Sequence, residues 1–219
     1  MSDPFSDIDK DVTLDKLKSL LYKYKKLIIT LLAFITVFSV TLYYLNNNKK
    51  AKDIRLSGYL IEIISIINAE DERAIKELVK LSKLGHSGHE ILSNLLLSKI
   101  YLKKQDFQAA INHLSKIEIK SKKLAPLNKL KNYFMSVAYL GLNNEKEFKK
   151  SINLLISYGG YWSLLGHELR GHFSIEQGNL IAAKKDFNKI INEQLSTQSL
   201  RARAQEMINK INLNNEGNS

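Results

Sequence analysis

The chain contains five histidines, the side chain that most often serves as a metal ligand or general base near neutral pH. Four of them follow a glycine: His86, His89, His167 and His172. Helical two-histidine metal sites use residues four apart, whereas His167 and His172 are five apart and do not share a helix face. His86 and His89 flank a Ser-Gly pair, with Glu90 as the nearby carboxylate. We therefore expect no metal site.

Other motifs for catalysis are missing from the sequence. The chain has no cysteine, which excludes thiol nucleophiles and cysteine-ligated zinc. It also has no Gly-x-Ser-x-Gly elbow and no phosphate-binding glycine loop. The stretch Tyr158–Trp162 gathers two glycines and three aromatic residues, as a ligand loop would, but a helix end followed by a turn is the stronger interpretation. We expect a protein that is not an enzyme and that uses no cofactor and no small-molecule substrate.

The net charge of +11 suggests a polyanionic partner, but its composition weakens that interpretation. The surplus comes from 28 lysines and only 5 arginines. Arginine makes the bidentate contacts to phosphate and guanine that specific nucleic-acid recognition uses. We expect no nucleic-acid partner, and a binder of nucleic acid or anionic surfaces stays as a third alternative.

One segment has the character of a membrane span. Residues 27–45 contain no charge, proline or glycine, and lysine pairs at 25–26 and 49–50 flank them. A run of nineteen uncharged, mostly apolar residues matches the thickness of a bilayer, and Tyr43 and Tyr44 fall where an interfacial aromatic belt would lie. We predict one N-terminal transmembrane helix, with a buried core helix as the alternative.

The charges around this segment predict its orientation. Six lysines precede it and four basic residues follow closely, which favours a cytoplasmic N-terminus. The tail, residues 1–26, includes a partly amphipathic helix with Leu14, Leu17, Leu21 and Tyr24 at helical spacing. The larger domain, residues 46–212, is expected on the far side of the membrane.

The remaining sequence predicts an all-α fold made of repeated helical hairpins. Two prolines and ten glycines interrupt the chain, and helical segments recur between short polar breaks. Small residues open four segments at spacings of 36, 41 and 32, close to the 34 of a tetratricopeptide repeat (TPR). The residues expected to pack the repeats are Ala74, Ala110, Leu114, Ser151, Gly171, Gly178, Ala183 and Phe187. A plain helical bundle is the alternative.

The array should end in a capping helix, Thr197–Asn212, followed by a disordered tail at residues 213–219. First helices of such hairpins line a concave face that binds peptides or proteins. The positions predicted to line this groove are Asn94, Ser98 and Tyr101 in one repeat and Asn132, Ser136 and Tyr139 in the next. For about half of them, ordinary hairpin packing is the alternative.

Two ends of the chain resemble a known family. The N-terminal residues are Asp3-Pro4-Phe5, Leu17 and Lys23-Tyr24-Lys25, and the C-terminal ones are Trp162, Leu165, Glu168, Gly171, Gly178, Ala182-Ala183, Phe187 and residues 200–206. This pattern resembles the membrane-anchored tetratricopeptide-like proteins of proteobacteria, a family that includes the ancillary subunit of the SecYEG translocon. Ser151 departs from it, since alanine is usual there.

The resemblance implies a single-pass inner-membrane protein with a periplasmic helical domain. Such a protein would act as an adaptor that contacts the translocon and periplasmic chaperones and assists newly exported proteins. The alternative is a structural assembly factor for another protein complex of the envelope.

Overall fold

The computed structural model describes residues 38–39, 41–67, 69–84, 87–119 and 124–216. These residues form helices and no strand, so the all-α prediction is confirmed for the part of the chain that they cover. The chain divides into two compact units, Met1–Leu56 and Ser57–Ser219.

In the first unit the described residues 38, 39 and 41–56 are helical. The predicted tail, residues 1–26, and residues 27–37 and 40 of the predicted span lie outside the described residues. Phe38, Tyr43 and Tyr44 are exposed. Within the described ranges, no helix combines the length and the apolar character needed to cross a membrane.

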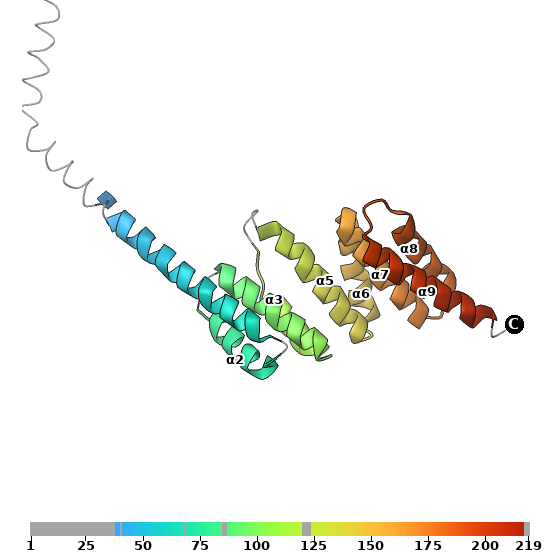
Figure 1. Cartoon of the computed structure of the whole chain (residues 1–219), viewed down its shortest axis with the longest axis horizontal. Helices are drawn as coiled ribbons and strands as arrows, with labels where there is room; N and C mark the ends of the chain where they lie inside the picture. The colour runs from blue at the N-terminus through green and yellow to red at the C-terminus, as the bar shows by residue number, and fades with distance from the viewer. Residues whose placement is uncertain (1–37, 40, 68, 85–86, 120–123, 217–219) are drawn as a thin grey trace, which may run out of the picture. The chain divides into compact units, whose positions relative to one another are not determined.

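The second unit begins with helical residues 57–66 and continues through eight further helices in the part that the structure describes (Figure 1). These are α2 (Asp71–Ser82), α3 (Ser87–Lys103), α4 (Phe107–Ser115), α5 (Ala125–Gly141), α6 (Glu145–Ser157), α7 (Gly160–Glu176), α8 (Leu180–Asn192) and α9 (Gln198–Glu216). Helix α9 continues past Asn212, so the prediction of disorder from residue 213 is wrong for residues 213–216. The sequence offers no helix breaker there before Gly217.

Three loops between helices share one backbone geometry. Gln105, Asn143 and Gly178 precede α4, α6 and α8, and their φ angles are 60°, 52° and 71°. Each is followed by a residue whose backbone N–H donates back to the preceding helix and whose side chain caps the next one. These N-cap residues are Asp106, Asn144 and Asn179, which accept from the backbone N–H of Ala109, Glu147 and Ala182. The same pair of residues, one with positive φ and then an N-cap residue, therefore ends one helix and starts the next in all three loops.

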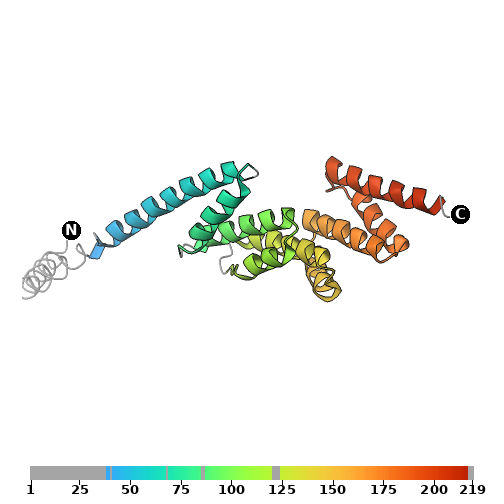
Figure 2. The same ribbon diagram turned by 90° about the horizontal axis from the view of Figure 1, so that it is seen from below.

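The helices pack in two layers. Each of α2 to α9 packs on its neighbour in sequence, and α3, α5 and α7 also pack on one another in series (Figures 1 and 2). Helices α3, α5 and α7 therefore form one layer. Helices α4, α6 and α8 each complete a hairpin with the member of that layer before them.

The N-cap residues define the register of the repeated core. Four residues after Glu70, Asp106, Asn144 and Asn179, the buried side chains are Ala74, Ala110, Phe148 and Ala183. Four positions further on they are Leu78, Leu114, Ile152 and Phe187. Every one of these eight side chains is at most 1% exposed. Five of the residues expected to pack the repeats are thus buried in the structure: Ala74, Ala110, Leu114, Ala183 and Phe187.

Ser151 is a correction to the predicted register. The residue of α6 that corresponds to Ala110 and Ala183 is Phe148, because the N-cap residue of α6 is Asn144, earlier than the spacing of small residues suggested. Phe148 fills this place by packing against Phe173 of α7, with ring centroids 4.8 Å apart. Ser151 lies three residues later, on the side of α6 that faces α5.

The two glycines predicted to pack the last hairpin act differently. A Cβ on Gly171 would lie 2.7 Å from Cζ of Phe187, so only glycine lets α7 approach α8 this closely. Gly178 has open space around its Cα and is favoured by its positive φ. Trp162 packs against both the Phe148 and the Phe187 clusters, which supports the interpretation of Tyr158–Trp162 as a helix end and turn.

Candidate protein-binding surface

The first three residues predicted to line a groove lie inside the α3–α4 hairpin. Asn94 and Ser98 are buried. The Asn94 side chain donates to the Glu90 carbonyl, and its Oδ1 lies 2.9 Å from Nδ1 of His113 on α4. The Ser98 hydroxyl donates to the Asn94 carbonyl at 2.6 Å and lies 3.3 Å from the Ala110 carbonyl. Tyr101 is half-buried, and its ring stacks on His113 with centroids 5.5 Å apart.

The second three residues play the same part between α5 and α6. The Ser136 hydroxyl is buried and donates to the Asn132 carbonyl at 2.9 Å, and its oxygen lies 3.0 Å from the Ser151 hydroxyl. Asn132 is half-buried and donates to the Tyr158 hydroxyl, while Tyr139 packs against the Phe148 cluster. The groove prediction is therefore wrong for Asn94, Ser98 and Ser136, because small polar side chains on these first helices face the second helix and let it approach.

One register position carries a polar side chain in every hairpin described. Seven residues after each N-cap stand Glu77, His113, Ser151 and Asp186. Each is hydrogen-bonded to the preceding helix, by Tyr59, Asn94, Ser136 and His167 respectively. Acceptance by Glu77 raises the pKa of Tyr59 to about 12, and burial followed by the charge of Lys116 lowers the pKa of His113. These bonds fix how the two helices of a hairpin meet.

The strongest of these connections joins α7 to α8. Arg170 donates from Nε to Oδ2 of Asp186 at 2.9 Å and from Nη2 to Oδ1 at 2.6 Å. His167 Nδ1 lies 2.8 Å from the same Oδ1. Burial acts to raise the pKa of Asp186, but the hydrogen bonds and charges of Arg170 and His167 outweigh it and hold the pKa below its usual value. Asp186 is therefore an ionised carboxylate inside the hairpin.

A second ion pair joins the last helix, α9, to α7. Arg203 of α9 donates to Glu168 of α7 at 2.7 and 3.1 Å, although the two residues are 35 positions apart. Glu168 is 9% exposed, so the pair is shielded from solvent on one side. It adds a polar connection to the apolar contacts of Leu200, Ala204 and Ile211 with α7 and α8.

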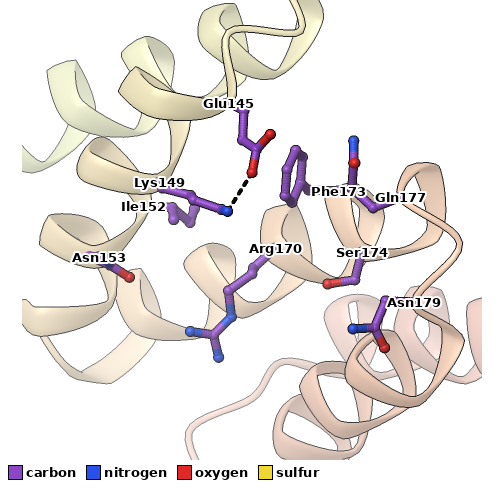
Figure 3. Close-up of a pocket in the computed structure, with 9 residues that line it drawn as sticks. All are labelled: Glu145, Lys149, Ile152, Asn153, Arg170, Phe173, Ser174, Gln177 and Asn179. Atoms are coloured by element: carbon purple, nitrogen blue, oxygen red, sulfur yellow. Dashed lines mark hydrogen bonds and ion pairs between the residues drawn. The ribbon is translucent and has the colours of Figure 1, made fainter.

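The surface of α7 that lies between α6 and α8 carries two hollows. One, of about 460 Å³, is lined from α6 by Glu145, Lys149, Ile152 and Asn153, and from α7 and the following turn by Arg170, Phe173, Ser174, Gln177 and Asn179 (Figure 3). The other, of about 410 Å³, is lined by His167, Arg170, Lys185, Asp186, Asn188, Lys189 and Asn192. Arg170 borders both, and we call the two together the α6–α8 channel.

Sequence reasoning missed this channel. Its lining residues come from three helices that the fold brings together, and its lysines resemble the exposed lysines on other helices such as α3 and α9. One available signal was arginine itself: Arg170 is one of five arginines in a chain with 28 lysines. The fixed geometry of the guanidinium suits a defined ion pair better than lysine does.

The histidines are dispersed in the described structure. His167 and His113 lie in separate hairpins, and His172 contacts the edge of Phe187. His86 lies outside the described residues. Among the residues that the structure describes, no group of three or more acidic or histidine side chains is placed to hold a metal ion.

Comparison of the chain with known protein families, curated proteins and solved structures finds no match.

Proposed function

We propose that the chain is a membrane-anchored protein whose helical domain is a TPR-like array and binds other proteins. The observation that supports this most directly is the repeated hairpin. Three loops share a left-handed residue followed by an N-cap residue, and the first helices α3, α5 and α7 pack in series. Arrays of this kind expose long surfaces that bind polypeptides without transforming them. The proposed protein is accordingly an adaptor and not an enzyme.

The proposed anchor is the apolar segment at residues 27–45. Its length, its flanking lysines and its tyrosines support a single pass through the inner membrane. The proposed topology puts residues 1–26 in the cytoplasm and residues 46–212 in the periplasm. Fusion of a reporter that is active only outside the cytoplasm to the C-terminus tests it, and an inactive, stably expressed fusion would overturn it.

The proposed site of action is the SecYEG translocon. The support is the resemblance at both ends of the chain, together with the effect of a tether, which raises the local concentration of the array for chains that emerge nearby. In this role the domain would hold newly exported proteins and periplasmic chaperones close to the exit of the channel.

Site-specific photocrosslinking in native membranes tests the partner. A photoreactive residue is placed at exposed positions of the domain, Asn188 on α8 and Lys99 on α3, and adducts are identified by mass spectrometry. We expect adducts with translocon subunits or periplasmic chaperones from at least one position. Adducts exclusively with another envelope complex would overturn the translocon and support the alternative, an assembly factor for that complex.

A further inference from the structure

We propose that the α6–α8 channel binds an extended, acidic segment of a partner polypeptide. This proposal rests on the proposed function, because it names the binding site on this chain and the kind of partner segment that binds there. The channel lies away from the predicted groove residues Asn94, Ser98 and Ser136, which are buried inside hairpins.

The packing of the helices explains why there is a channel at this place. Helices α6 and α8 both pack on α7, and among the described residues neither packs closely on the other. On the side of α7 that carries His167, Arg170 and Ser174, one hollow therefore lies against α6 and the other against α8, and they share Arg170. Two adjoining hollows suit an elongated ligand better than a compact one.

The lining of the channel is cationic. Its lining has four basic side chains, Lys149, Arg170, Lys185 and Lys189, and two acidic ones, Glu145 and Asp186. Arg170 already neutralises Asp186, so most of the basic charge is left for a ligand. Lys149 pairs with Glu145, and Lys189 lies 3.6 Å from Glu193, in both cases four residues apart on one exposed helix face. Exposed pairs of this kind contribute little to stability, so a carboxylate of a ligand can replace the internal partner.

Arg170 is a preformed donor at the centre of the channel. Its Nε and Nη2 are held by Asp186, while its side chain is 38% exposed. The bonds to Asp186 use Nε and Nη2 and leave Nη1 as a further donor of a guanidinium already fixed in orientation. Binding to a fixed donor loses less conformational entropy than binding to a free arginine.

The amides of the lining favour a peptide over a phosphate-bearing ligand. Asn153, Gln177, Asn188 and Asn192 border the two hollows. Each carries a donor and an acceptor, and the backbone of an extended peptide also presents both, one N–H and one C=O per residue. Phosphate oxygens only accept, so the acceptor oxygens of these amides would stay without a partner beside a phosphate. The observed mixture of amides and cations thus matches an acidic peptide.

The test measures binding of a fluorescently labelled peptide of alternating glutamate and serine to the full chain purified in detergent. We expect binding that weakens as salt is raised and that is absent for a matching lysine–serine peptide. The variant Lys149→Glu/Lys185→Glu/Lys189→Glu reverses three charges of the channel and should weaken binding roughly tenfold or more. Arg170 is left unchanged in this test because it also holds Asp186.

The matched control is Lys99→Glu/Lys146→Glu/Lys150→Glu, which makes the same change of net charge at exposed positions outside the channel. We expect it to change the affinity less than about twofold, because screening weakens charges that do not touch the ligand. Equal losses in the two variants would overturn the proposal, because they would show attraction by net charge alone. Tighter binding of a DNA oligonucleotide or of anionic lipid vesicles than of the acidic peptide would also overturn it.

Circular dichroism of both variants excludes unfolding as the cause of a loss. The two proposals fail separately: photocrosslinks to the translocon that persist in the channel variant, together with no binding of the acidic peptide, would refute the channel and leave the adaptor function standing.

Discussion

At the scale of single residues, the α7–α8 hairpin holds a buried charge whose loss of a partner should reduce stability. Asp186 has a side chain only 6% exposed, and two donors from α7 hold it in the ionised form. A buried carboxylate that loses its partner is costly, whereas the intact pair contributes little net stability. Removal of Arg170 is therefore expected to reduce stability mainly because it leaves the Asp186 carboxylate buried without its main partner.

The variant Arg170→Leu should lower the free energy of unfolding by about 2 kcal/mol at pH 7. This is less than for a fully buried pair, because Arg170 is partly exposed. The pKa of Asp186 lies below its ordinary value of 3.8 in the folded chain, so its stabilising contribution is present above about pH 4 and is lost as the pH falls through the folded pKa. Without Arg170 the pKa of Asp186 rises, so its stabilising contribution above about pH 4 shrinks and less stability is lost on acidification.

Urea unfolding followed by the fluorescence of Trp162, the single tryptophan, measures this at a series of pH values. Trp162 packs on the core of this hairpin, so its signal reports the relevant region. Arg73→Leu, which removes an exposed pair on α2, serves as the control and should stay within about 0.5 kcal/mol. A loss of stability on acidification that is as large in Arg170→Leu as in the unchanged chain would contradict the assigned role of Arg170.

At the scale of elements, the three equivalent loops place three different residue types at the same position. Gln105 and Asn143 adopt the left-handed conformation that Gly178 adopts in the third loop. The left-handed conformation is unfavourable for residues with a side chain but not for glycine. Asparagine adopts this conformation more readily than glutamine does. Gln105 is therefore the most strained of the three.

Replacement of Gln105 by glycine should raise the free energy of unfolding by about 0.5 kcal/mol, because relief of strain exceeds the added entropy of the unfolded chain. The reciprocal change Gly178→Gln should lower it by about 1 kcal/mol. Thermal unfolding followed by circular dichroism measures both. Gln205→Gly, the same substitution at an exposed position inside α9, should instead destabilise the chain by about 1 kcal/mol. Destabilisation by Gln105→Gly would show that the loop geometry does not control stability in this way.

At the scale of the whole molecule, an array and a bundle respond differently to a local defect. In an array each hairpin contacts only its neighbours, so damage at one end spreads over a short range. In a bundle all helices share one core. The described helices pack on their neighbours in sequence and, within one layer, on the next member.

Leu200→Ala tests this difference. Leu200 of α9 is buried against α8, and its truncation should cost about 2–5 kcal/mol locally. Hydrogen exchange followed by mass spectrometry should show faster exchange in α8 and α9 and unchanged exchange in α3 and α4. Leu213→Ala, at an exposed position of the same helix, should leave exchange unchanged. Acceleration throughout α3–α9 would indicate one cooperative bundle and contradict the array.

The sequence by itself determined what depends on neighbours along the chain. The all-helical class follows from composition and periodicity, and the burial of Ala110, Leu114 and Ala183 follows from their spacing on a helix face. The polar residues Asp106, Asn144 and Asn179 are local start signals, because an N-cap bond joins residues only three apart.

Only the tertiary structure decided how the helices face one another. It placed Phe148, not Ser151, in the repeated core, turned Asn94, Ser98 and Ser136 into the hairpins, and opened a channel over α7 where α6 and α8 stay apart. The physical reason is that helical periodicity fixes which residues share a face but not which partner that face meets. Contacts such as Arg170 with Asp186 or Glu168 with Arg203 join residues 16 and 35 positions apart and arise only when whole helices pack.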